Sequence, residues 1–141
     1  MKQKFYLFSM LLIAALFSGC PDPAPKNPVF ELGKAFSIMQ GLTMQTADND
    51  LNIYFDKVSG DSRCPENVEC IWAGRADCLF TLTSNGDAES VTLSSGDFSQ
   101  GGSGQASFKG YTITLKNIEP PKVANTEIEQ KDYKATLTVT K

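Results

Sequence analysis

Residues 61–74 read DSRCPENVECIWAG and lie between two runs in which apolar and polar residues alternate. The runs extend from Leu51 to Val58 and from Ile71 to Thr83. A period of two is typical of β-strands with one buried face. The stretch also holds two of the four cysteines and the only tryptophan. We therefore predict that it is a cross-linked hinge between two strands of the core.

The cysteines of this region differ in their surroundings. Pro65 turns the chain after Cys64, so that Cys64 and Cys70 enclose a short loop. Cys78 lies on the apolar face of the second run, next to Phe80 on that face, where a buried thiol packs as a small apolar group. We predict a Cys64–Cys70 disulfide, with Cys78 buried and free. Closing so short a loop stabilises the fold by about 2 kcal/mol in the chain-entropy model.

A catalytic or metal-binding role for the cysteines is not favoured. Redox enzymes usually carry two cysteines separated by two residues at the start of a helix, whereas Cys64 and Cys70 are separated by five residues and no helical pattern follows. A structural zinc site needs four ligands, and the chain has no histidine. We expect a structural role for the cysteines, no metal site and no cofactor.

Trp72 lies two positions after Cys70, so in a strand the two side chains would point to the same face. In immunoglobulin-like domains a tryptophan packs against a disulfide in the core, and we expect the same of Trp72. The alternative is a ligand-stacking role, which requires that one face of the ring is exposed.

Four charged residues of the hinge form a candidate binding loop. Asp61 and Arg63 flank Ser62, where they can pair with each other or cap backbone groups. The alternative for this pair is a charged recognition site, because binding residues concentrate on loops. Glu66 and Glu69 complete the candidate set.

Alternating runs continue on both sides of the hinge, and no stretch after residue 29 shows sustained helical periodicity. Turn signals recur about every ten residues, with Ser84-Asn85-Gly86-Asp87 as a strong hairpin turn. This pattern predicts an all-β antiparallel immunoglobulin-like sandwich of about seven to eight strands. A small β-barrel is the alternative.

The N-terminal segment has the features of a secretion signal. Lys2 and Lys4 precede the apolar run Phe5–Phe17, and two small residues then precede Cys20. This resembles the bacterial lipoprotein signal, in which the cysteine is acylated and becomes the new N-terminus. We predict that residues 1–19 are removed and that Cys20 is lipidated. The alternatives are a plain secretory signal cut near Gly19 and a short core helix.

The predicted mature chain begins with a proline-rich tether at residues 20–29, which favours an extended, semi-rigid path. A single domain follows at residues 30–141. The net charge of −3 becomes −5 without Lys2 and Lys4. This charge argues against nucleic-acid binding and against attraction to anionic lipid headgroups. The lipid, and not the charge, would therefore hold the protein in the bacterial cell envelope. We expect it at the outer membrane, with an envelope protein or a small ligand as its partner.

Other functional motifs are weak. A Ser-His-Asp triad cannot form without histidine. The glycine-rich segment 101–104 lacks the lysine of a phosphate-binding loop. Asp48-Asn49-Asp50 resembles the opening of a calcium loop, but the later EF-hand positions do not match. An ordinary turn is favoured there, and a looser calcium site at Asp48 and Asp50 stays open.

The hinge also resembles a signature of small uncharacterised bacterial envelope lipoproteins: DSRCP, four residues, then CIWAG. The resemblance extends to a strand on each side and to a late segment, GYTITL at residues 110–115, that leads to Pro120. It implies the two hinge cysteines, whereas Cys78 is additional in this chain. It implies no particular activity.

These observations favour a non-enzymatic, lipid-anchored module that binds or supports a component of the envelope. Its binding surface would consist of loops at one end of the sandwich, including residues 61–69 and 96–105. One alternative is a protease-inhibitor-like module, which would need apolar, rigid loop tips. The other is an enzyme that uses a pair of carboxylates, but nothing in the sequence places two of them together.

Overall fold

The computed structural model describes residues 26–96 and 101–141. The predicted signal segment 1–19, the lipidation site Cys20 and the first part of the tether lie outside the described residues, as do residues 97–100 of the second candidate loop. The described part of the chain contains no helix that is long and apolar enough to cross a membrane.

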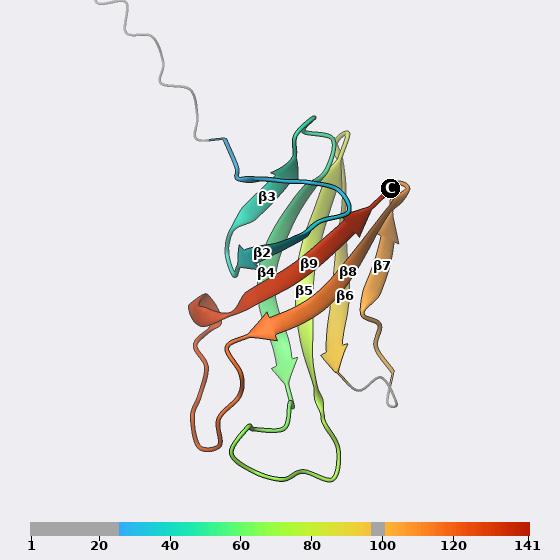
Figure 1. The fold of residues 1–141 in the computed structure, drawn as a ribbon. Helices are drawn as coiled ribbons and strands as arrows, with labels where there is room; N and C mark the ends of the chain where they lie inside the picture. Colours follow the sequence, from blue (N-terminus) through green and yellow to red (C-terminus); the bar gives the residue numbers. More distant parts are fainter. Residues whose placement is uncertain (1–25, 97–100) are drawn as a thin grey trace, which may run out of the picture.

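The described residues form two facing sheets (Figure 1). The first sheet has the order β1-β3-β4-β5-β6, and the second has the order β2-β9-β8-β7. The bounds in the first sheet are β1 (Val29–Phe30), β3 (Thr43–Thr46), β4 (Asn52–Asp61), β5 (Arg75–Ser84) and β6 (Asp87–Gly96). Those in the second are β2 (Ala35–Met39), β7 (Gln105–Phe108), β8 (Tyr111–Glu119) and β9 (Lys134–Thr140), the last preceded by the 3₁₀ turn η1 (Gln130–Asp132).

All strand pairs are antiparallel except the short parallel pair of β1 and β3. The sheets form a sandwich, as predicted, and not a closed barrel. The described residues contain nine strands, against the seven to eight expected, and β1 is only two residues long. It begins at Val29, one residue before the predicted start of the domain.

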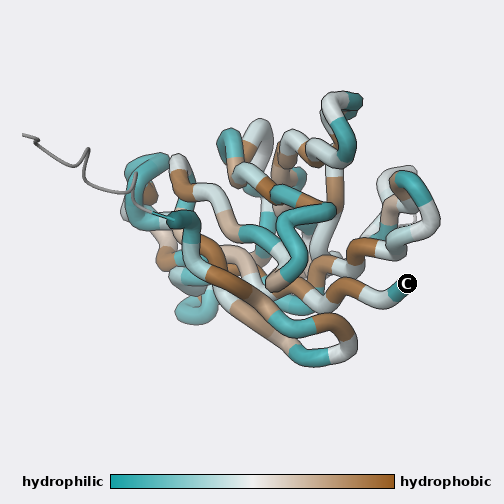
Figure 2. The backbone as a smooth tube through the Cα atoms, turned by 90° about the horizontal axis from the view of Figure 1, so that it is seen from above, coloured by the Kyte–Doolittle hydropathy of each residue, from teal (hydrophilic) through white to brown (hydrophobic). Residues whose placement is uncertain are grey.

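One core lies between the sheets, and it follows the predicted alternation. In β5 the residues at every second position, Ala76 to Leu82, are fully buried, and the residues between them are partly exposed. The rings of Phe55 in β4 and Phe80 in β5 stack with their centroids 4.7 Å apart. Figure 2 shows hydrophobic and hydrophilic segments that follow one another along the backbone. The prediction for this face, including the buried free thiol of Cys78, is confirmed.

The hairpin between β5 and β6 is also confirmed. Asn85 and Gly86 have φ of 50° and 86°, which are the left-handed conformations that a two-residue turn of this kind needs. The turn sets the register, with Ser84 opposite Asp87, and ten residues of each strand then pair.

The hinge region departs from the prediction at its second boundary. The strand after the hinge was expected to begin at Ile71, but β5 begins at Arg75. The segment from Ile71 to Gly74 lies outside the sheet, because Gly74 adopts a φ of +65° that interrupts the extended path. The inward position that was predicted for Trp72 therefore does not hold.

Candidate functional site

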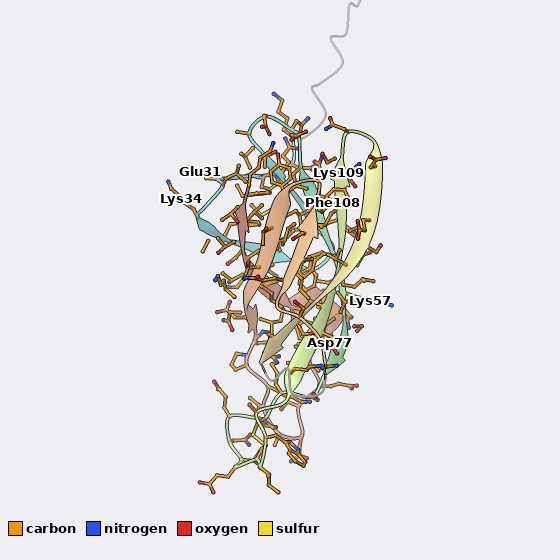
Figure 3. The ribbon with its side chains drawn as sticks, turned by 90° about the vertical axis from the view of Figure 1, so that its right-hand side faces the viewer. Glu31, Lys34, Lys57, Asp77, Phe108 and Lys109 are labelled. Carbon is orange, nitrogen blue, oxygen red and sulfur yellow. A yellow bond between two sulfur atoms is a disulfide. The ribbon has the colours of Figure 1, made fainter. Side chains whose placement is uncertain are left out.

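Two loops project beyond the strands at the same end of the sandwich (Figures 1 and 3). Residues 62–74 connect β4 to β5 and are called the disulfide loop here. Residues 120–129 follow β8 and are called the companion loop. The start of the described chain, coloured blue, lies near the opposite end of the sandwich in Figure 1.

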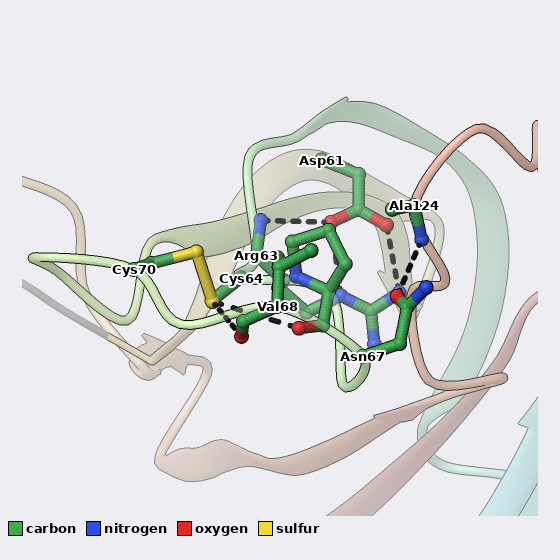
Figure 4. The surroundings of a disulfide bond; sticks show 8 residues. Asp61, Arg63, Cys64, Asn67, Val68, Cys70 and Ala124 are labelled. Carbon is green, nitrogen blue, oxygen red and sulfur yellow. Dashed lines mark hydrogen bonds and ion pairs between the residues drawn. A yellow bond between two sulfur atoms is a disulfide. The ribbon is translucent and has the colours of Figure 1, made fainter.

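The disulfide loop is closed at its base and cross-linked within. Cys64 and Cys70 form a disulfide with a Cα–Cα distance of 5.9 Å, as predicted (Figure 4). The Ser62 amide donates to the Arg75 carbonyl at 2.8 Å, and the Cys64 amide donates to the Ala73 carbonyl at 2.7 Å. These bonds continue the β4–β5 pairing into the loop, so the loop leaves the sheet as a two-stranded stem.

Gly74 is required where the two sides of the stem meet. A Cβ atom at this position would lie 1.9 Å from the carbonyl oxygen of Ser62. Since that oxygen belongs to the backbone, no side-chain movement could relieve the overlap. The positive φ of Gly74 adds a second reason for glycine at this position.

Asp61 and Arg63 form a two-pronged ion pair at the base of the loop. The Arg63 Nη2 atom lies 2.7 Å from Asp61 Oδ2, and Arg63 Nε lies 2.9 Å from Asp61 Oδ1. The guanidinium also donates to the backbone carbonyls of Ile118 and Pro120, at 2.7 and 2.9 Å. Arg63 thus ties the disulfide loop to the end of β8 and to the start of the companion loop.

Two further residues complete this network. The Tyr133 hydroxyl donates to Asp61 Oδ2 at 3.1 Å, and the Lys122 ammonium donates to the Asp61 backbone carbonyl at 2.6 Å. Asp61 therefore accepts hydrogen bonds from three other residues, and it comes from neither loop but from the last position of β4.

The network shifts the titration of its members. Burial alone would raise the pKa of Asp61, but the side-chain and backbone hydrogen bonds from Arg63 outweigh it and hold the pKa below its usual value. Burial likewise opposes the charge of Arg63, yet the hydrogen bond to Asp61 raises the pKa of Arg63. Burial, followed by the neighbouring Asp61 charge, raises the pKa of Tyr133 to about 12. At neutral pH the ion pair is fully charged and the tyrosine is neutral.

The two loops also contact each other directly. The Glu66 amide donates to the Lys122 carbonyl at 2.9 Å, and the Ala124 amide donates to the Asn67 side-chain carbonyl at 2.9 Å (Figure 4). Together with the Arg63 bonds, these contacts hold the disulfide loop and the companion loop as one unit.

The outer part of this unit is apolar and exposed. Ile71 is 93% exposed and Trp72 is 68% exposed, with Val68 at 45% and Val123 at 40%. These four make up half of the exposed large hydrophobic residues among those described. The prediction that Trp72 packs in the core against the disulfide is wrong. Residues two positions apart point to the same side only within a strand, and neither Cys70 nor Trp72 belongs to a strand.

The four residues of the candidate binding loop separate into two pairs. Asp61 and Arg63 are bonded to each other and to backbone groups, as the structural interpretation expected. Glu66 and Glu69 are exposed on the disulfide loop. The residues that sequence reasoning missed are Ile71 and Val123. The sequence did contain a signal that Ile71 is exposed. Ile71 lies between Cys70 and Gly74, so it belongs to the loop and need not be buried.

A shallow pocket of about 300 Å³ lies beside the ion pair, lined by residues that include Val58, Tyr133 and Gln130. Gln130 closes it on one side by exchanging two hydrogen bonds of 2.9 Å with the backbone of Val58. Among the described residues, no buried side-chain polar atom lacks a hydrogen-bond partner. Four polar residues of this lining, Asp61, Lys122, Gln130 and Tyr133, are thus hydrogen-bonded within the protein.

The other end of the sandwich carries the acidic turn at residues 48–50. Asp48 accepts the Asp50 amide at 3.1 Å, which is an ordinary turn contact. The Asp50 carboxylate accepts from Tyr111 at 2.6 Å, from Asn85 at 3.1 Å and from Lys141 at 3.3 Å. The Tyr111 hydrogen bond, followed by that of Lys141, lowers the pKa of Asp50. In the described ranges no three potential metal ligands of the His, Cys, Asp or Glu type lie together.

Cys78 is an unreactive thiol. It is fully buried in β5, and burial raises its pKa to about 12. Because the thiolate is the reactive form, a thiol in this environment does not act as a nucleophile at neutral pH.

No family model matches the chain, and neither a curated protein nor a solved structure matches it. The residues and their geometry are therefore the whole basis for a function.

Proposed function

We propose that this protein is a lipid-anchored module of the bacterial cell envelope that acts by binding and not by catalysis. The lipid would be attached at Cys20, and the proline-rich tether would connect it to the sandwich. The anchor rests on the signal-like N-terminus, and the resemblance of residues 61–74 to small envelope lipoproteins points to the same compartment. The outer membrane is the proposed site.

One observation carries the binding role. The disulfide loop is held by a disulfide, an ion pair and hydrogen bonds to the companion loop, yet it exposes Ile71 and Trp72 at its surface. Exposed tryptophans in ordered surroundings are frequent energetic centres of protein interfaces. A rigid loop also loses little conformational entropy on binding. The loop lies at the end of the sandwich away from the start of the described chain (Figure 1).

The anchor is tested by substitution of Cys20. Wild-type protein should fractionate with membranes, and its mass should show a diacylglyceryl modification. The Cys20→Ala variant should keep the sandwich but lose the modification and leave the membrane fraction. Membrane association that is unchanged in Cys20→Ala would contradict lipid anchoring at this position.

The binding role is tested by capture from envelope membranes. The double variant Ile71→Ser/Trp72→Ser removes the apolar surface of the disulfide loop. The matched control Met39→Ser/Leu42→Ser removes two other exposed apolar side chains, which are 39% and 52% exposed. We expect the first variant to lose partners that the wild type and the control retain. Identical partner sets for all three proteins would count against the loop.

A protease-inhibitor-like module is the second candidate function. The exposed apolar residues on a cross-linked loop favour it, because such a loop tip is the feature that this class of inhibitor would need. Assays against a panel of cysteine and serine proteases test it. Inhibition that Trp72→Ala abolishes would support this function, and failure to inhibit any of them would remove it.

A further inference from the structure

The disulfide loop combines two features that favour the binding of a partner. Its backbone is held in place, and its outermost side chains are large and apolar. Ile71 is almost fully exposed, so its packing contributes little to the stability of the sandwich. The Trp72 side chain is 68% exposed, so its indole N–H can donate to an acceptor on another molecule.

The charges near this apolar surface are acidic. Glu66 and Glu69 lie on the disulfide loop and Glu127 lies on the companion loop, all three exposed. The nearby cations are engaged within the protein, because Arg63 pairs with Asp61 and Lys122 donates to the Asp61 carbonyl. An occupant of this surface therefore meets apolar side chains on loops that also carry exposed carboxylates.

From these features we infer that Ile71 and Trp72 form a docking finger that enters an apolar pocket on a folded envelope protein, with basic residues at the rim of that pocket. This inference rests on the proposed binding function and names the chemistry of the partner. The exposed carboxylates of the two loops favour a basic rim, because complementary charges guide and orient association.

Two other occupants fit the observations less well. A bilayer surface with anionic lipids would repel the glutamates, and the finger lies at the end of the sandwich away from the start of the described chain (Figure 1). A second copy of the chain in a two-fold contact would bring the same glutamates together. Like charges placed opposite each other oppose such a contact.

The main test is photo-crosslinking with the full-length, membrane-anchored protein in intact cells. Benzoylphenylalanine replaces Ile71 in one variant and Leu42, which is also exposed and apolar, in the control. We expect a discrete protein adduct from position 71 that position 42 does not give. Adducts with lipid only, adducts with a second copy of the chain, or equal adducts from both positions would overturn the inference.

Two substitutions in the position-71 variant examine the chemistry of the pocket. Trp72→Ala should lower the adduct yield by about tenfold or more, as expected for a central interface residue. The double substitution Glu66→Lys/Glu69→Lys should lower the yield several-fold, because it brings positive charge against the basic rim. An unchanged or increased yield after the charge reversal would exclude a basic rim. Thermal unfolding of each variant must match that of the wild type, which shows that the loop is still folded.

Fluorescence gives an independent test of the lipid alternative, because Trp72 is the only tryptophan in the chain. The full-length protein is compared in detergent and in vesicles of phosphatidylcholine and phosphatidylglycerol. We expect the same water-like emission and the same quenching by acrylamide in both. A shift to shorter wavelength with protection from acrylamide in vesicles would place the finger in lipid and overturn the inference.

The finger and the proposed binding function can fail separately. If Trp72→Ala retains every envelope partner of the wild type, the protein still binds but not through this finger. If the wild type itself captures no envelope protein beyond those that the capture matrix alone retains, both statements fail.

Discussion

The two ends of β4 carry similar groups in different surroundings. Asp61 lies at one end of β4, and Asp50 lies just before the other end. Each carboxylate accepts a hydrogen bond from a tyrosine and forms an ion pair with a cation. The side chains of Arg63 and Asp61 are only 15% and 9% exposed, whereas those of Lys141 and Asp50 are 54% and 28% exposed. Exposed pairs contribute up to about 1 kcal/mol, but removal of one member of a buried pair costs about 3–5 kcal/mol.

This difference shows where the fold uses its strong interactions. The end with the Asp50 turn is closed by short hairpins, and its ion pair adds little. The end with the disulfide loop has two long connections that extend beyond the strands, and the buried pair, the disulfide and the stem at Gly74 hold them. These interactions fix a loop that the core does not need, because the large side chains of that loop, Ile71 and Trp72, are exposed. The following experiments compare the two ends directly.

The largest effect is expected from glycine substitutions. Gly74→Ala places a Cβ atom 1.9 Å from a backbone oxygen, at a positive φ, and should destabilise the protein by about 4 kcal/mol. Gly33→Ala at the other end also has a positive φ, of +77°, but meets nothing within 4 Å, and should cost about 1 kcal/mol. Urea denaturation measures both values. Equal losses would mean that the stem of the disulfide loop adjusts freely.

The second largest effect is expected from removal of the buried ion pair, compared with removal of the exposed one. Arg63→Ala leaves Asp61 and the carbonyls of Ile118 and Pro120 without their donors and should cost about 3 kcal/mol. Lys141→Ala removes the exposed partner of Asp50 and should cost no more than about 0.5 kcal/mol. The free energy of unfolding at low and high salt tests both, since only the exposed pair is strongly screened. A loss below about 1 kcal/mol for Arg63→Ala would refute its anchoring role.

The disulfide should have a smaller effect than the ion pair. Cys64→Ser/Cys70→Ser opens a short loop and should cost about 2 kcal/mol. The stem hydrogen bonds of Ser62 and Cys64 use backbone atoms and should persist. Hydrogen exchange of those amides provides the measurement, together with denaturation. Complete loss of their protection would show that the disulfide, and not the ion pair, holds the loop.

The sequence predicted those features that depend on local pattern. Alternation in β5 identified the buried positions of Cys78 and Phe80, because a strand with one covered face has a period of two. The Asn85-Gly86 turn was predictable because few residues adopt its conformation. The short spacing and Pro65 were enough to predict the pairing of Cys64 with Cys70.

The features that sequence reasoning missed depend on contacts between distant segments. Arg63 donates to Ile118, 55 residues along the chain, and no local pattern indicates that acceptor. Gly74 lies directly before the start of β5. Only glycine fits there because the backbone of Ser62 approaches it closely. That boundary decides whether Trp72 is buried, so the error on Trp72 follows directly from the error on the start of β5. The exposed finger could be identified only after both were known.

The last comparison concerns alkaline pH, and its effect is absent at neutral pH and appears only above about pH 9. The pKa values of Cys78 and Tyr133 rise to about 12 from 9.0 and 10.0, chiefly through burial. Between the ordinary and the raised value the native state keeps a proton that the unfolded state has lost. Stability is therefore fully present below about pH 9 and falls as pH rises toward 12, by at most about 1.4 kcal/mol per pH unit for each such group.

Cys78→Ala should remove the part of this loss that begins near pH 9 and leave the part due to Tyr133. The substitution also lowers stability at every pH by about 1 kcal/mol through lost packing, so the slopes of the unfolding free energy against pH are compared, not its values. Tyr111→Phe at the other end serves as the control. The pKa of Tyr111 is raised mainly by its hydrogen bond to Asp50, and the Lys141 ammonium opposes that rise. If Tyr111→Phe flattened the alkaline slope more than Cys78→Ala, the buried groups near the disulfide loop would not be its source.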